Sequence, residues 1–205
     1  MGFGIAVVLT LLAAPVLSES PPTLVLAGTP RIPDAAVEGG EVRLEAQVDV
    51  QGAVQDVKVL RDTPPFTAGL VEAVKAWRFE ASSGGAPQRP VRALVVGLFR
   101  APGFGDQIAP GRDQAVAGRD VPLPRSTVVP PCPAGIVRNA VVVLEVEVSR
   151  AGRTANVRVV GGEAPFTDLA AQSVRRWTFR PAERAGQPAS GRVWVVVGFR
   201  APIVP

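Results

Sequence analysis

An internal repeat constrains this chain more than any other feature of its sequence. The tripeptide PFT at residues 65–67 returns at 165–167, WxF at 77–79 returns at 177–179, and FRAP at 99–102 returns at 199–202. The ungapped alignment of residues 30–102 with residues 130–202 holds about 23 identities over about 73 positions. Because self-similarity at a fixed spacing is the signature of duplicated structural units, the sequence predicts two tandem copies of one small module.

Each copy opens with a predicted β-hairpin. Apolar residues alternate with polar ones from Val42 to Val50, Gly52 follows as the turn residue, and Val57 and Val59 begin a second alternating run. Strict alternation over such a run is typical of a half-buried strand. The second copy repeats the pattern between residues 142 and 159, with its glycine at 152.

A helix and a final strand complete each module. Phe66, Leu70, Val74 and Trp77 follow one another at spacings of four, four and three, which places them on one face of a helix. Thr67 and Thr167 stand at the expected N-cap positions, where their hydroxyls would accept a backbone N–H of the first turn. The final strands span residues 92–99 and 192–199. Since a helix and a sheet each bury one apolar face against the other, the predicted fold class is α+β. It consists of two tandem small modules, each a three-stranded antiparallel sheet covered on one face by a helix (β-β-α-β), with a short helix before it as an option. The residues expected to form the two cores are Phe66, Val74, Trp77, Phe79, Phe99, Phe166, Val174, Trp177, Phe179 and Phe199.

The rest of the chain divides around these modules. Residues 1–20 are a targeting segment, because residues 3–17 are apolar apart from Thr10 but fall short of the about 20 residues that a spanning helix needs. We expect a cleaved signal peptide there, with a short uncleaved anchor as the alternative. The first module spans residues 30–102, a linker rich in Gly and Pro spans 103–128, and the second module spans 129–205.

The composition argues against several classes of function. The chain has no histidine, and its single cysteine, Cys132, lies between two prolines. The commonest general base and zinc ligand are therefore missing. The acids Glu45 and Glu145 are expected on the solvated face of a strand, and no phosphate or dinucleotide fingerprint is present. Few aromatic side chains accompany the scattered arginines, which disfavours nucleic acid. We therefore expect that the protein is not an enzyme and has no catalytic residues, cofactor, metal or nucleic-acid partner. We expect it to contact a membrane only through its N-terminal segment.

The order of elements, read with the WxFxPA block at residues 177–182 and a closing strand that ends in Phe199, resembles the TonB C-terminal domain. The resemblance covers about 150 of the 205 residues. It is fuller in the second copy, because the first has Glu80-Ala81 where the family favours Pro-Ala. It implies a periplasmic protein that binds a partner peptide, such as a segment of an outer-membrane receptor, with a role in TonB-dependent energy transduction and transport across the outer membrane.

In that family the final strand lies at the sheet edge, and a receptor segment pairs with it. Strand addition of this kind satisfies the free N–H and C=O groups of an edge. Carried over to this chain, the resemblance places partner binding on the two final strands. The residues expected to line these edges are Arg92, Leu94, Val96, Leu98, Arg192, Trp194 and Val196.

Two questions stay open at the level of sequence. Apolar residues on both faces of the final strands indicate that the second face is also covered. Its cover is the other module or a short N-terminal segment, a docked partner, or a second copy of the chain in a homodimer. The leader lacks the histidine of full transducers, and no long periplasmic span follows it. A structural or assembly scaffold of the cell envelope is therefore the alternative to a peptide-binding protein.

Overall fold

A computed structural model describes residues 22–33, 36–80, 90–102, 106–132 and 138–201. The predicted targeting segment lies outside these residues. The optional short helix before each module is expected near Pro33 or Pro133; residues 133–137 lie outside the described part, and the described residues 30–33 and 36–38 are not helical. The first half contains β1 (Leu24–Leu26), β2 (Gly39–Val48), β3 (Val54–Asp62), α1 (Phe66–Lys75), β4 (Arg78–Phe79) and β5 (Val91–Phe99). The middle contains β6 (Ile108–Ala109), β7 (Arg112–Asp113) and β8 (Leu123–Ser126). The second half contains β9 (Ala140–Val148), β10 (Thr154–Gly161), α2 (Phe166–Val174), β11 (Thr178–Arg180), β12 (Ala182–Arg184), β13 (Gln187–Ala189) and β14 (Gly191–Phe199). Neither helix is long and apolar enough to cross a membrane.

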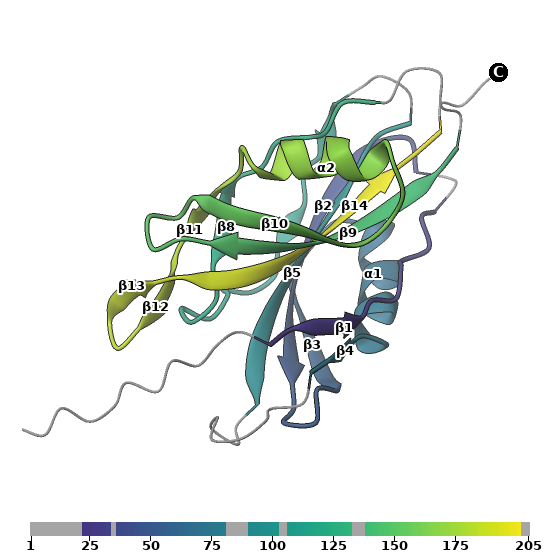
Figure 1. Ribbon diagram of the computed structural model, residues 1–205. Coiled ribbons are helices and arrows are strands. Elements are labelled where there is room, and N and C mark those ends of the chain that lie inside the picture. The colour runs from purple at the N-terminus through teal and green to yellow at the C-terminus, as the bar shows by residue number, and fades with distance from the viewer. Residues whose placement is uncertain (1–21, 34–35, 81–89, 103–105, 133–137, 202–205) are drawn as a thin grey trace, which may run out of the picture.

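The two halves share one continuous sheet, so the prediction of two separate three-stranded modules is wrong. The sheet has eight strands in the order β10-β9-β14-β5-β2-β3-β7, with β6 attached to β2 (Figure 1). Strands within each half pair antiparallel, as expected, but β5 and β14 pair with each other in parallel at the centre. The reason lies in those final strands. Each is apolar on both faces and has a free edge, and pairing them buries both faces and satisfies both edges.

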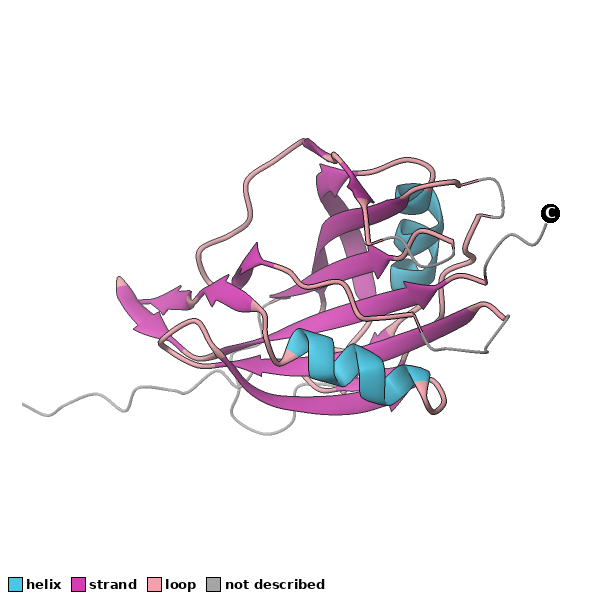
Figure 2. Cartoon of the chain, turned by 90° about the horizontal axis from the view of Figure 1, so that it is seen from above, coloured by secondary structure: helices cyan, strands magenta, loops and turns pink. Residues whose placement is uncertain are grey.

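The register at this central pair places the two helices on opposite faces of the sheet. Val193 lies opposite Leu94 and Val195 opposite Val96, so each residue faces the one 99 positions away. Equivalent residues are 100 positions apart, and side chains alternate between faces along a strand. Leu94 therefore points to one face of the sheet and its equivalent, Trp194, to the other. Figure 2 shows the strands passing between the two helices.

Each half therefore contributes to two hydrophobic cores. The core beneath α2 includes Leu94, Val96 and Leu98 of the first half. The core beneath α1 includes Trp194 and Val196 of the second half, and Phe79 packs edge-on against Trp194 with ring centroids 5.1 Å apart. The ten predicted core residues are all buried, with Trp77 at 0% and Trp177 at 1% exposure. The prediction of the core positions is confirmed, although each core draws on both halves.

The segments that precede each half are held in equivalent ways. The indole Nε1–H of Trp77 donates to the carbonyl of Gly28 at 2.8 Å, and that of Trp177 donates to the carbonyl of Val128 at 3.1 Å. Strand β1 pairs with β4, and β8 pairs with β11. The tryptophans thus fix the leading segment of each half as well as closing the helix over the sheet.

Two local expectations need correction. Helix α1 begins at Phe66 and α2 at Phe166, with Pro65 and Pro165 as N-cap residues that make no side-chain cap hydrogen bond. Thr67 therefore lies within the first turn, and its hydroxyl instead accepts the N–H of Thr63 at 2.9 Å. The predicted linker is also structured, since β6, β7 and β8 lie in it. Ala117 and Val121 are buried against the face of the sheet opposite α1.

Candidate protein-binding edge

The final strands do not form sheet edges, so the predicted binding site on them is wrong. Strand β5 lies between β2 and β14, and β14 lies between β5 and β9. The apolar residues predicted to line the edges are at most 1% exposed: Leu94, Val96, Leu98, Trp194 and Val196. Of the alternatives for what covers these strands, packing of the two halves against each other is confirmed.

The two arginines predicted at these edges are engaged within the chain. Arg92 donates to Asp120 at 2.5 Å, and its Nε lies 3.8 Å from a carboxylate oxygen of Glu45. Arg192 lies 3.2 Å from Glu145 and donates to the carbonyl of Pro22 at 3.0 Å. Both arginines therefore hold parts of the fold together.

The acids Glu45 and Glu145 are not solvated as expected. Glu145 is 5% exposed, and Arg158 also pairs with it at 2.6 Å. Glu45 accepts the backbone N–H of Gly118 at 2.7 Å, which ties the middle segment to the sheet. A carboxylate that is bound to arginine or to backbone N–H groups at its strand position serves as a structural anchor.

The sheet has two edges, one in each half of the chain. The edge of the first half, at β3, is partly covered. Strand β3 is paired at its end with β7, and the N–H groups of Gln114 and Ala115 donate to the carbonyl of Leu60. Arg61 donates to Asp113 at 2.9 Å, and this hydrogen bond lowers the pKa of the Asp113 carboxyl below its ordinary value. Added strands, covering segments and charged side chains are the usual means by which natural proteins protect sheet edges.

The edge of the second half is strand β10, and its outer edge is not covered by another strand of the described residues. Among the described residues, β9 is the only strand that pairs with it, apart from a single bridge between Arg153 and Thr178 next to its start. The N–H of Val157 donates to Oδ1 of its own neighbour Asn156 at 2.9 Å, so this group is turned away from β9. Because inward and outward groups alternate along an antiparallel strand, the N–H of Val159 also faces outward, whereas that of Arg158 faces β9.

The two faces of β10 differ in chemistry. Val157 lies opposite Val146 and Val159 opposite Leu144, so these valines share the face that α2 covers. Val159 is nevertheless 44% exposed. Asn156 and Arg158 lie on the other face, beside Glu147 and Glu145. A strand added at β10 would therefore have apolar neighbours on the sheet face that α2 covers and polar neighbours on the other face.

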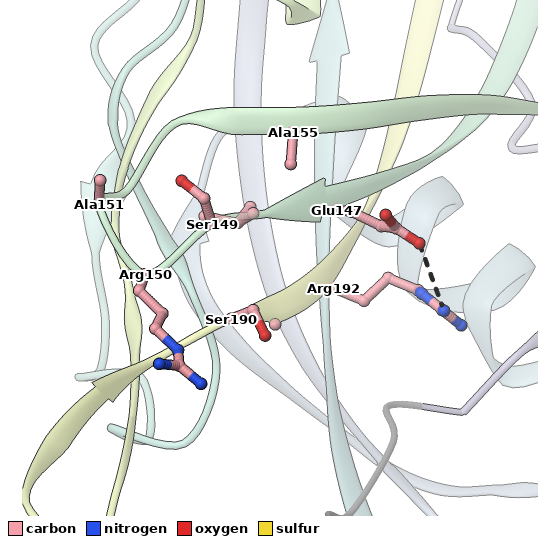
Figure 3. A pocket seen from close by; sticks show the side chains of 9 residues that line it. Glu147, Ser149, Arg150, Ala151, Ala155, Ser190 and Arg192 are labelled. Carbon is pink, nitrogen blue, oxygen red and sulfur yellow. Dashed lines mark ion pairs between the residues drawn. The ribbon is translucent and has the colours of Figure 1, made fainter.

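A cavity of about 620 Å³ lies at the hairpin end of the same strands. Figure 3 shows it between the β9–β10 turn and the start of β14, with Arg150 and Ser190 on one side and Ala155 of β10 at its border. The ion pair between Arg192 and Glu147, 3.8 Å apart, lies at its other end. No group of three or more acidic or cysteine side chains is placed to hold a metal in the part of the chain that the structure describes.

Strand β10 belongs to a segment that comparison with protein families picks out. Residues 137–200 match the family described as Gram-negative bacterial TonB protein C-terminal. The match covers one copy, so the prediction of two tandem copies of this domain is corrected to a single match, in the second half. TonB C-terminal domains are typically periplasmic, and they generally interact with proteins such as outer-membrane receptors. No curated protein matches the chain.

The open strand could not be found from the sequence. Its pattern marks residues 154–161 as one arm of a hairpin, as predicted. Whether that arm is interior or outermost depends on the order of strands in the sheet, which is set by the pairing of β5 with β14.

Proposed function

We propose that this chain is a periplasmic, non-enzymatic protein that captures an extended segment of a partner protein by strand addition at β10. The observation that carries the proposal is the open, outward-facing edge of β10 within the TonB-type segment. An unpaired edge offers a row of backbone donors and acceptors that an extended peptide satisfies. A role in energy transduction for transport across the outer membrane is the further proposal that the family match supports.

Site-specific photo-crosslinking in the cells that make the protein tests this proposal. A photoreactive residue at Val159, on the open edge, should crosslink to one defined partner protein. The same residue at Val116, which is 85% exposed but lies away from this edge, should not. The proposal is refuted if both positions give the same products, or if neither gives any.

Proline substitutions then test whether the backbone of β10 makes the contact. Val157→Pro removes an outward N–H and leaves the ladder to β9 intact, so it should abolish the crosslink at Val159 while the protein stays folded. Arg158→Pro removes an N–H that faces β9, so it should lower stability as well. A crosslink of wild-type intensity in folded Val157→Pro would exclude strand addition.

An envelope scaffold without a transduction role is the second candidate. The observation that favours it is the fused sheet, because the edge that the family uses for its receptor segment is filled in each half by the other half. Genes for proton-driven motor subunits beside this gene would favour transduction, and a crosslinked partner that is a structural envelope protein would favour the scaffold.

A further inference from the structure

Three exposed arginines gather at the start of β10. Arg153 immediately precedes the strand, and its backbone forms a bridge with Thr178. Arg175 and Arg176 follow the last turn of α2, which lies close because the Thr154 hydroxyl donates to the carbonyl of Val174 at 2.9 Å. All three side chains are exposed, and none of them forms an ion pair with another described residue. The start of the open edge therefore carries an unneutralised positive charge.

The opposite end of β10 carries acids. Glu163 follows the strand, and its carbonyl accepts the N–H of Thr167 at 3.1 Å, which places it at the start of α2. Asp168 lies in the first turn of that helix and is exposed. Although Arg138 pairs with Glu163, no described cation pairs with Asp168. The edge is thus positive where β10 begins and negative where it ends.

The repeat supplies an internal control for this charge pattern. At the positions equivalent to Arg153, Arg175 and Arg176, the first half has Ala53, Lys75 and Ala76. At the positions equivalent to Glu163 and Asp168 it has Thr63 and Ala68. The same backbone therefore forms with only one of these charges, at Lys75, and the half that carries all of them is the half whose outer strand is open. Helix and turn formation alone do not require them.

We propose that the partner segment bound at β10 is an extended peptide with a cluster of two or more carboxylates at the end that lies beside Arg153, Arg175 and Arg176. This inference rests on the proposed function and names the chemistry of the partner. Apolar side chains at alternate positions would lie over Val157 and Val159 on the face of α2. Arg138 neutralises Glu163, but the carboxylate of Asp168, unpaired among the described residues, repels the same carboxylates at the far end, so the charge pattern also selects the direction in which the segment binds.

Three labelled ten-residue peptides of alternating threonine and valine test the inference by fluorescence anisotropy. One begins with two aspartates, one ends with two aspartates, and one has two asparagines in their place. One acidic peptide should bind the full-length protein about tenfold tighter than the asparagine peptide, because two carboxylates gain several exposed ion pairs. Raising the salt concentration from 50 to 500 mM should remove most of this preference.

Variants assign the preference to the arginines. The double variant Arg175→Gln, Arg176→Gln should lose most of the preference for the acidic peptide and keep its affinity for the asparagine peptide, which also shows that it is folded. Lys75→Gln, at the equivalent position of the first half, should change neither affinity.

The outcomes separate the two proposals. Equal binding of all three peptides overturns this inference and leaves strand addition standing. No binding of any peptide at millimolar concentration, together with no crosslink at Val159, overturns both. A second copy paired antiparallel through β10 would also bring positive and negative ends together. A dimer in sedimentation velocity that Val157→Pro converts to a monomer would therefore overturn the assignment of the charges to a separate partner.

Discussion

The three tryptophans differ in one respect that predicts different responses to the same substitution. All are at most 1% exposed. The indole N–H groups of Trp77 and Trp177 have carbonyl partners, whereas Nε1 of Trp194 is buried with no hydrogen-bond partner among the described residues. Replacing tryptophan with phenylalanine removes the N–H in each case. It relieves an unsatisfied donor only at position 194.

The magnitudes follow from this difference. Each Trp→Phe change removes roughly 40 Å³ of buried volume, which costs about 1 kcal/mol at about 24 cal/mol per Å³. Trp77→Phe also loses a hydrogen bond, at about 1 kcal/mol, while Trp194→Phe recovers the penalty of a buried unsatisfied donor, about 1–3 kcal/mol. Trp77→Phe should therefore be less stable than Trp194→Phe by at least about 2 kcal/mol. Trp194→Phe itself should be close to the wild type.

Urea unfolding followed by far-ultraviolet circular dichroism measures both variants without relying on tryptophan fluorescence. Trp177→Phe is the intermediate case, because the Val128 carbonyl keeps a second donor in the hydroxyl of Ser173. Equal losses of stability in Trp77→Phe and Trp194→Phe would refute the reasoning, since they would mean that the Trp194 N–H is satisfied in solution.

Three further predictions follow from the fold. Gly152→Ala should cost about 1 kcal/mol more than Gly186→Ala in urea unfolding. Both glycines have a positive φ, but a Cβ at 152 would lie 2.1 Å from the Phe179 carbonyl oxygen, and one at 186 would meet nothing within 4 Å. The hydrogen bond from Arg61 lowers the pKa of Asp113, so the stability that this carboxylate contributes is present above the ordinary pKa of 3.8 and is lost as the pH falls through the lowered pKa. In Asp113→Asn the free energy of unfolding should therefore depend less on pH in that acidic range. Residues 129–205 expressed alone should elute above the monomer mass in size-exclusion chromatography, because the central edge of β14 and the ring of Trp194 lose their cover.

The elements within each half were predictable because each has its own periodicity. Alternation marked the hairpins, the glycines at 52 and 152 marked their turns, and the spacing from Phe66 to Trp77 marked the helix. The N-caps were misplaced by two residues, at Thr67 and Thr167 instead of Pro65 and Pro165, because the two threonines are cap-type residues that here lie inside the first turn.

The order of the strands was not predictable in the same way, since a side-chain pattern shows which residues are buried but not which strand lies beside them. Leu94 and Trp194 on the predicted outer faces signalled a cover, and the sequence left its identity open. The middle segment escaped notice because its strands have two to four residues, too few to show a period. Because the strand order was unknown, the sequence could not show that the outer edge of β10 is uncovered and that of β3 partly covered.

The odd offset of the central register restricts how the length of this chain can change. Strands β5 and β14 each have nine residues. Inserting one residue midway along β14 would send every later side chain to the wrong layer, turning apolar groups that now pack under α2 toward α1 and the reverse. One such insertion would disrupt the packing of both hydrophobic cores, whereas an extra residue in a loop outside the sheet would disrupt neither. We therefore expect relatives of this protein to vary freely in the loops that precede the two central strands and to keep the strands themselves at constant length, even where their residues differ.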